Sequence, residues 1–326
     1  MAFRIRHILV AIRDERRTAR APLRKAAALA RATGARIELF HALNEPAALD
    51  ALRRGSVAGH PTAEIMQALT ARAEKRLARL AALDEFKGLK VSCAATWDFP
   101  PHEAVIRRAM VARTSLVIAS AQPQETGGRL LLANTDWELI RHCPAPVLVV
   151  KNARPWRKPA VIAAVDPFHA HDKPASLDRR ILEAGEYVAR ELKGALHVFH
   201  AYMPLPVIAP GPAGQPLAVV VPPEIEQVHS TRIEQVLDKV AARAGVPPRR
   251  RHLRMGATAD ELASVVRETG AGLIVLGAVS RSGLKRFFIG STAETVLDRL
   301  DSDLLVVKPR DFSTRVPRRA TLAWLS

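Results

Sequence analysis

Short apolar runs alternate with longer amphipathic segments along the whole chain. The short runs are uninterrupted by polar residues, which is typical of parallel strands that are buried on both faces of a sheet. The longer segments carry apolar residues three and four positions apart, as in Ile181, Ala184, Tyr187 and Val188. This spacing predicts helices with one buried face. Strands that alternate with helices predict right-handed crossovers and a parallel sheet covered by helices on both sides.

The same order of elements occurs twice. In the first half we expect strands at 5–12, 36–43, 89–97, 115–120 and 146–150, with helices near 16–33, 62–83, 101–113 and 135–142. In the second half we expect strands at 160–166, 195–202, 250–255, 272–277 and 303–307, with helices at 175–192, 223–244, 258–269 and 291–300. The fold class is therefore α/β, with two doubly wound, five-stranded parallel-sheet domains.

The two halves are also related residue by residue. Ser120 and Gly277 both end the fourth strand of their half, Lys151 and Lys308 both follow the last strand, and each pair is separated by 157 residues. The same order at a constant separation indicates a tandem duplication of one domain. A polar, proline-containing segment joins the copies. We place the domains at 1–152 and 159–310, followed by a basic tail at 311–326.

Composition and charge narrow the classes of partner. The formal charge of +17 suggests nucleic acid or an acidic surface as a partner. The arginines are spread over the whole chain and aromatic residues make up only 5%, so we expect no specific nucleic-acid site. No stretch approaches the roughly 18 apolar residues of a membrane span. Two cysteines without a pairing pattern, and no cleavable leader, predict a cytoplasmic location.

The strongest candidate for a binding site is the loop after the fourth strand of the second half. Ligands of open α/β sheets bind beyond the carboxyl ends of the strands. A glycine at 277 permits close approach of the backbone, and the segment 290–292 opens a helix whose free N–H groups suit a phosphate. A capped helix after a solvated loop explains the same residues equally well. The candidate residues of this loop are Gly277, Ser280, Lys285, Arg286, Gly290, Ser291 and Thr292.

This loop resembles the nucleotide loop of the universal stress protein family. That family carries a glycine, two residues, a second glycine, nine residues, and then a glycine followed by Ser, Thr or Asn. Here Gly277 is followed after two residues by Ser280, and after nine more by Gly290-Ser291. Asp166 matches the strand-end aspartate that meets the adenine and ribose side of ATP in the family. The resemblance covers nearly the whole chain in two copies, and 134–151 and 290–309 are similar to the tandem, E-type subgroup.

The resemblance implies a non-catalytic stress-response protein with two Rossmann-like domains of the adenine nucleotide alpha hydrolase type. It implies ATP or a related adenine nucleotide as ligand, Mg²⁺ with it, and at most slow hydrolysis. Ser280 replaces the second glycine, which costs about 1 kcal/mol if that position needs a positive φ. The first half departs further from the family pattern. Arg13 replaces the aspartate, and the three glycines are replaced by Ser120, Pro123 and Ala133. We therefore predict nucleotide binding in the second domain only.

Two alternatives stay open. The apolar, proline-rich stretch 203–223 is too long for an ordinary connection. It could form a lid over a lipid-like, amphipathic ligand, or a loop packed against the other half. Alternatively, the protein is an interaction module without a ligand, in which strands 146–150 and 303–307 pair within the chain as an internal pseudo-dimer and hide both edges. Protein partners or a homodimer are compatible with either alternative.

Evidence for catalysis or a metal is weak in the sequence. There is no nucleophile elbow, no Ser/His/Asp order and no H-E-x-x-H motif. His197 and His200 are three apart on one strand and point to opposite faces, so we expect no shared metal. His41 and His200 occupy matching strand ends, where they are structural or line the cleft. The helix dipole accounts for four carboxylates near helix starts: Asp98, Glu103, Asp260 and Glu261.

Overall fold

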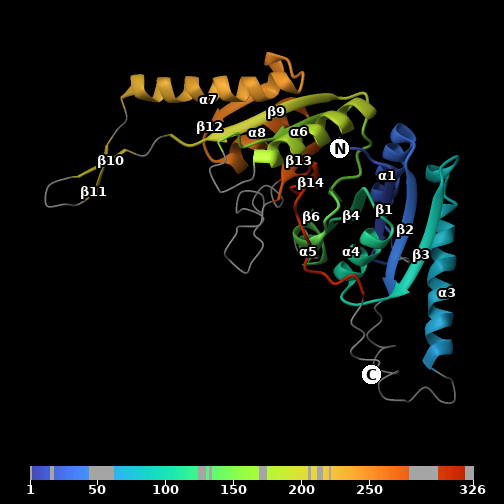
Figure 1. Ribbon diagram of the computed structural model, residues 1–326. Helices are drawn as coiled ribbons and strands as arrows, with labels where there is room; N and C mark the ends of the chain where they lie inside the picture. Colours follow the sequence, from blue (N-terminus) through green and yellow to red (C-terminus); the bar gives the residue numbers. More distant parts are fainter. Residues whose placement is uncertain are drawn as a thin grey trace.

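Ten strands from both halves of the chain form one continuous sheet (Figure 1). The computed structural model describes residues 2–14, 18–43, 62–123, 130–131, 134–168, 175–204, 207–210, 216–219, 222–278 and 300–319. The strands are β1 (His7–Ile12), β2 (Arg36–Leu43), β3 (Val91–Trp97), β4 (Leu116–Ser120), β7 (Val147–Val150), β8 (Ala160–Ala164), β9 (Ala195–Tyr202), β12 (Arg251–Met255), β13 (Leu273–Gly277) and β14 (Asp303–Val307). Their order in the sheet is β12-β9-β8-β13-β14-β7-β4-β1-β2-β3.

Helices cover both faces of this sheet. They are α1 (Arg20–Thr33), α3 (Thr62–Ala81), α4 (Pro101–Val111), α5 (Asn134–His142), α6 (Ala175–Glu191), α7 (Pro223–Arg243) and α8 (Thr258–Thr269). Single 3₁₀ turns occur at Asp84–Phe86 and Pro248–Arg250. None of the helices in the described ranges combines the length and the apolar character that crossing a bilayer requires.

Each half has the predicted doubly wound topology. In the first half the order is β3-β2-β1-β4-β7, and in the second half it is β12-β9-β8-β13-β14, with every strand pair inside a half parallel. The direction in which strands are added reverses between β1 and β4, and again between β8 and β13. Crossover helices leave in opposite directions from such a point, so a crevice for a ligand opens there at the carboxyl edge.

The two halves join through their last strands. β7 and β14 are antiparallel, with Leu304 opposite Val149 and Leu305 opposite Leu148. The sequence predicts this pairing, which forms an internal pseudo-dimer and leaves neither last strand with a free edge. Because the junction is antiparallel, the amino edge of one half lies on the same side of the sheet as the carboxyl edge of the other.

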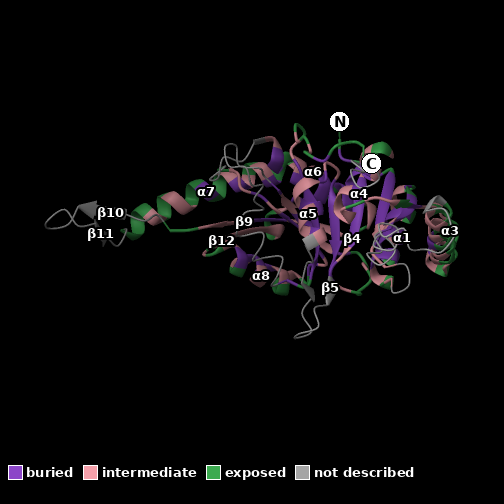
Figure 2. Cartoon of the chain, turned by 90° about the horizontal axis from the view of Figure 1, so that it is seen from below, coloured by how far each residue is buried: buried purple, intermediate pink, exposed green. Residues whose placement is uncertain are grey.

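The core consists of two apolar layers that both run across the junction. Alternate strand residues point to opposite faces, so Leu305 packs in the layer beneath α1, α3, α6 and α7, whereas Leu304 packs in the layer beneath α4, α5 and α8. Figure 2 shows the burial of the central strands between these helices. Burial of apolar surface on both sides explains why the strands read as unbroken apolar runs.

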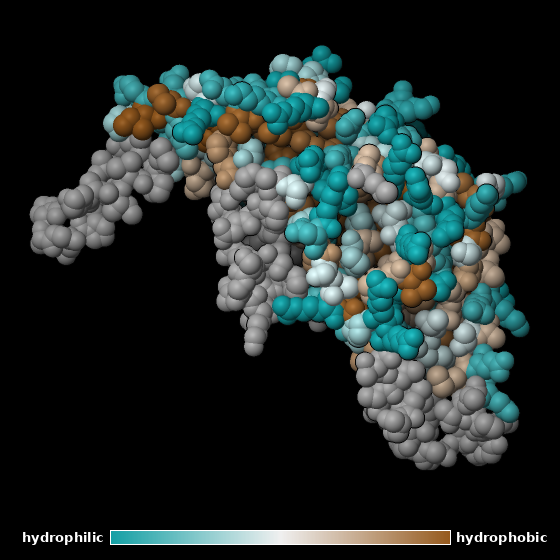
Figure 3. All heavy atoms as spheres, viewed as in Figure 1, coloured by the Kyte–Doolittle hydropathy of each residue, from teal (hydrophilic) through white to brown (hydrophobic). Residues whose placement is uncertain are grey.

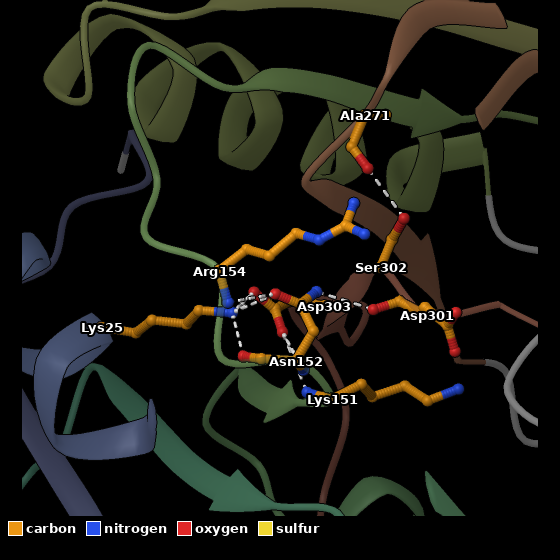
Figure 4. A network of polar contacts seen from close by, with 8 residues as sticks. All are labelled: Lys25, Lys151, Asn152, Arg154, Ala271, Asp301, Ser302 and Asp303. Carbon is orange, nitrogen blue, oxygen red and sulfur yellow. Dashed lines mark hydrogen bonds and ion pairs between the residues drawn. The ribbon is translucent and has the colours of Figure 1, made fainter. Parts of the chain in front are cut away.

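A buried polar network ties the first half to the second (Figure 4). Lys25 of α1 forms an ion pair with Asp303, the first residue of β14, and both side chains are almost fully buried. The Asp303 carboxylate also accepts the Lys151 N–H at 2.9 Å, and Lys25 donates to the Asn152 carbonyl at 2.7 Å. Burial lowers the pKa of Lys25 and raises the pKa of Asp303, while their mutual attraction opposes both shifts. The charges are therefore stable here only as a pair.

Two lysines make reciprocal contacts across the junction. Lys151 Nζ of the first half donates to the Leu300 carbonyl, and Lys308 Nζ of the second half donates to the Arg141 carbonyl at 2.7 Å. Arg141 lies in the last turn of α5, where carbonyl groups lack intrahelical partners and attract cations. Burial lowers the pKa of Lys308 to about 7. These contacts explain why both copies keep a lysine directly after their last strand.

The stretch 203–223 contains a short hairpin that the sequence does not predict. Its strands β10 (Val207–Pro210) and β11 (Pro216–Val219) pair antiparallel. They lie beyond the outer end of α7, away from β13 (Figure 1). The described strands of this stretch therefore do not form the lid, which is one of the two alternatives for it. The outer end of α7 is apolar on its surface (Figure 3), where Ile225 and Val228 are exposed.

Candidate functional site

The two strand-end crevices can be aligned through an equivalent histidine. In the first half His41 Nδ1 lies 2.8 Å from the Ile12 carbonyl, and in the second half His200 Nδ1 lies 3.0 Å from the Val165 carbonyl. A carbonyl oxygen only accepts, so each ring donates from Nδ1. Both histidines are buried, and each ties its strand to the end of the opening strand. The next residues, Arg13 and Asp166, therefore occupy equivalent positions, as the sequence comparison assumes.

The crevice of the first half is occupied by an internal ion pair. The Arg13 guanidinium contacts the carboxylate of Asp136, which is fully buried in the first turn of α5. A helix N-terminus attracts a negative group, and in this half the group is a carboxylate of the protein itself. The residue 157 positions later in the other half is Ala293, which has no charge. The first half thus holds its own anion where a phosphate would have to bind.

The crevice of the second half has a different polar arrangement. Asp166 is half-buried, and its backbone N–H donates to Asp178 Oδ1 at 3.1 Å. Asp178 is buried in the first turn of α6, the helix that begins beyond β8. Sequence reasoning did not single out Asp178 or Asp136. The available signal was an acidic residue in the first turn of each helix, which reads as ordinary helix stabilisation.

Gly277 has a packing role in addition to any role at a ligand. A Cβ atom at this position would lie 2.6 Å from Leu177 Cδ2 and 3.0 Å from Ile181 Cδ1. Side chains do not approach that closely, so a larger residue would require Leu177, or α6 with it, to shift away from the end of β13. Ser120 is the equivalent residue of the first half, and its hydroxyl donates to the Ala121 carbonyl at 3.2 Å. The glycine therefore allows α6 to lie close to the crevice.

The remaining loop residues of the predicted site lie outside the described residues, as does the predicted helix at 291–300 except for Leu300, which is not helical. These residues are Ser280, Lys285, Arg286, Gly290, Ser291 and Thr292. Within the described ranges, no group of three or more His, Cys, Asp or Glu side chains is placed to hold a metal ion. Both cysteines are free thiols.

Other polar residues noted in the sequence have structural partners. His197 stacks on His252, with ring centroids 5.2 Å apart and Nδ1 to Nε2 at 2.9 Å. The pKa of His197 is lowered to about 4, mainly by burial, and the neighbouring His252 lowers it further. Asp98 and Glu103 both bind the buried Arg107, at 2.7 and 2.8 Å. An ion pair therefore holds these carboxylates, in addition to the expected helix dipole.

The doubled sheet, the order of strands and the antiparallel junction define a class of duplicated Rossmann-like proteins that carry their dimer interface within one chain. The model of the universal stress protein family matches residues 4–151 and again residues 161–308. The chain therefore belongs to the universal stress protein family, with two domains in tandem.

Individual relatives agree with this assignment. Universal stress protein E of Escherichia coli strain K12 is 28% identical over 239 residues, which span 70% of this chain and 72% of the relative. A protein of unknown function from Pseudomonas aeruginosa PAO1 superposes with a TM-score of 0.69 and 25% identity, covering 94% of both chains. A universal stress protein from Archaeoglobus fulgidus shares the fold, with a TM-score of 0.64, 16% identity and coverage of 93% and 98%.

Proposed function

We propose that the second domain binds ATP or a related adenine nucleotide without catalysis, and that the first domain is its structural partner in a stress-response protein. The observation that carries the proposal is the asymmetry between the crevices. In the first half Arg13 and Asp136 neutralise each other where an anion would bind. In the second half Asp166 stands at the position of Arg13, and Ala293 at that of Asp136.

The chemistry of the second crevice suits a nucleotide. A carboxylate at 166 accepts hydrogen bonds from ribose hydroxyls, and the loop 277–292 supplies lysine, arginine and hydroxyl groups for phosphates. Mg²⁺ would accompany the phosphates and be held mainly by their oxygens and water. A cytoplasmic location is part of the proposal and is supported by two free thiols, of which Cys143 is fully buried.

The direct experiment is a titration of labelled ATP with Mg²⁺ against the wild type and two matched variants. Gly290→Asp places a carboxylate at the proposed phosphate position, whereas Ala133→Asp makes the same change at the equivalent position of the first half. We expect loss of binding only in Gly290→Asp. Asp166→Asn should weaken binding about tenfold, because a hydrogen bond to a charged acceptor is replaced by a neutral one.

Native mass spectrometry of the purified protein provides the second arm of the test. An adenylate mass that disappears in Gly290→Asp supports the proposal. A lipid-like mass would contradict the nucleotide proposal and would support an amphipathic ligand instead. If the wild type and both variants showed equal, negligible ATP binding, the nucleotide proposal would be wrong. The remaining alternative would then be an interaction module without a ligand.

A further inference from the structure

A crevice of about 370 Å³ lies between the two halves and is distinct from the proposed nucleotide site. The segment before β1, the end of α4 and the turn before β7 line it from the first half, and Arg180 of α6 lines it from the second. Phe3 fixes the two walls together, because its ring packs edge-on against Tyr187 of α6, with ring centroids 5.6 Å apart. This volume is within the range of pockets that hold small organic ligands.

The crevice carries positive charge that its lining does not balance. Arg4, Arg113 and Arg180 line it, and none of its lining residues is acidic. Burial lowers the pKa of Arg180 and the neighbouring Arg310 lowers it further, while Glu183 opposes the shift. Glu183 is itself engaged by Arg310 at 3.3 Å. Arg4 and Arg113 are exposed and Arg180 is half-buried, so the three arginines give the crevice a positive potential that attracts an anion.

Two residues of the crevice wall have a buried side-chain atom without a hydrogen-bond partner among the described residues. These atoms are Arg180 Nε and Thr114 Oγ1. Both atoms are enclosed by the protein, so they mark unsatisfied polar groups behind the crevice wall and do not by themselves identify a ligand. The neighbouring Phe3 and Met110 provide an apolar wall.

The crevice between the halves and the proposed nucleotide site both include residues of α6, but they use different residues of this helix. Asp178 of α6 accepts the Asp166 N–H, whereas Arg180 lines the crevice between the halves. Residues two positions apart on a helix do not share a face, so Asp178 and Arg180 lie on different sides of α6.

We propose that the crevice between the halves binds a small organic phosphate. Its oxygens accept hydrogen bonds from Arg113 and Arg180, while its organic part lies against Phe3 and Met110. Guanidinium groups suit phosphate because their forked N–H groups match its oxygens. The site takes residues from both halves, so only the assembled pseudo-dimer contains it.

Phenyl phosphate and inorganic phosphate are the probes, titrated calorimetrically into the full chain at constant ionic strength set with chloride. We expect phenyl phosphate to bind more tightly than inorganic phosphate, because only its ring can use the apolar wall. Arg180→Gln and Arg113→Gln should each weaken binding about tenfold. Arg249→Gln removes one exposed charge from the 3₁₀ turn before β12 and should leave binding unchanged.

The proposal would be overturned if both crevice variants bound phenyl phosphate with wild-type affinity. It would also be overturned if phenyl phosphate gave no more binding heat than added chloride. Arg180→Lys keeps the charge but lacks the forked N–H groups, so it provides the test if a glutamine variant does not fold. We expect Arg180→Lys to lose part of the affinity with its circular dichroism unchanged. Gly290→Asp should bind phenyl phosphate normally, which separates failure of this proposal from failure of the nucleotide proposal.

Discussion

Single residues decide what each crevice contains. Arg13 and Asp166 occupy equivalent positions in the fold, yet the first pairs with a buried carboxylate while the second is itself an acidic residue. Asp136 lies far along the chain from Arg13, so their contact depends on the folded domain. No pattern of local spacing could predict it.

Gly277 provides a direct test of packing at the crevice. We expect Gly277→Ala to lower the free energy of unfolding by about 1–3 kcal/mol, because the new Cβ would overlap Leu177. In a Leu177→Ala background the same substitution should cost much less, since the overlapping atoms are absent. Urea unfolding of the four proteins measures both effects. An equal cost in the two backgrounds would contradict the packing role, and Ser120→Ala is the matched control in the first half.

The stacked pair of His197 and His252 makes the edge of the second half sensitive to pH. The pKa of His197 falls from 6.5 to about 4 on folding. The unfolded chain therefore takes up the proton first, and the stabilisation is complete above pH 6.5 and is lost as pH falls toward 4. We expect the melting temperature of the wild type to drop more steeply through this window than that of His197→Gln. Parallel profiles for the two proteins would refute this, and His229→Gln on α7 should follow the wild type.

At the scale of elements, α1 and β14 are joined by a charge pair whose members belong to different halves. Lys25→Met leaves the Asp303 carboxylate buried and unpaired, so we expect a loss of about 3 kcal/mol in unfolding free energy. Lys25→Met combined with Asp303→Asn removes both charges and keeps an acceptor for the Lys151 N–H, so most of the loss should be recovered. Urea titrations would show the difference. Exposed Lys75→Met should change stability by less than about 0.5 kcal/mol.

The sequence predicts most of the elements because their patterns are local. β2, β9, α8 and β14 have the predicted bounds, and each of the other predicted elements that the structure describes agrees at one end and differs by one to four residues at the other. The doubly wound, parallel arrangement within each half follows from strand-helix alternation and the handedness of crossovers, whereas the order of the strands comes from the structure. The hairpin β10–β11 escapes prediction because prolines and glycines interrupt its short apolar runs. The loop that holds most of the candidate site residues lies outside the described residues, so those assignments stay predictions.

At the scale of the whole molecule, the β7–β14 junction predicts that the halves associate without their linker. Expressed as separate chains, 1–152 and 153–326 should form a one-to-one complex, because each alone exposes the edge of its last strand. Lys25 and Asp303 come from different halves, and Pro146 occupies the position of Asp303 in the first, so the mixed pair should prevail over either homodimer. Native mass spectrometry of the co-expressed chains measures this. Two separate monomers would contradict it.

Joining the halves within one polypeptide also changes how assembly and binding depend on concentration. A dimer of separate subunits dissociates on dilution, whereas two domains on one chain stay at a fixed, high effective concentration. Thermal stability should therefore be independent of protein concentration. A symmetric homodimer would contain two copies of every interface crevice, but among the described residues the crevice with Arg180 on one wall and Arg113 on the other occurs once. Duplication followed by fusion thus permits one ligand per molecule at a place where a symmetric dimer would have to bind two.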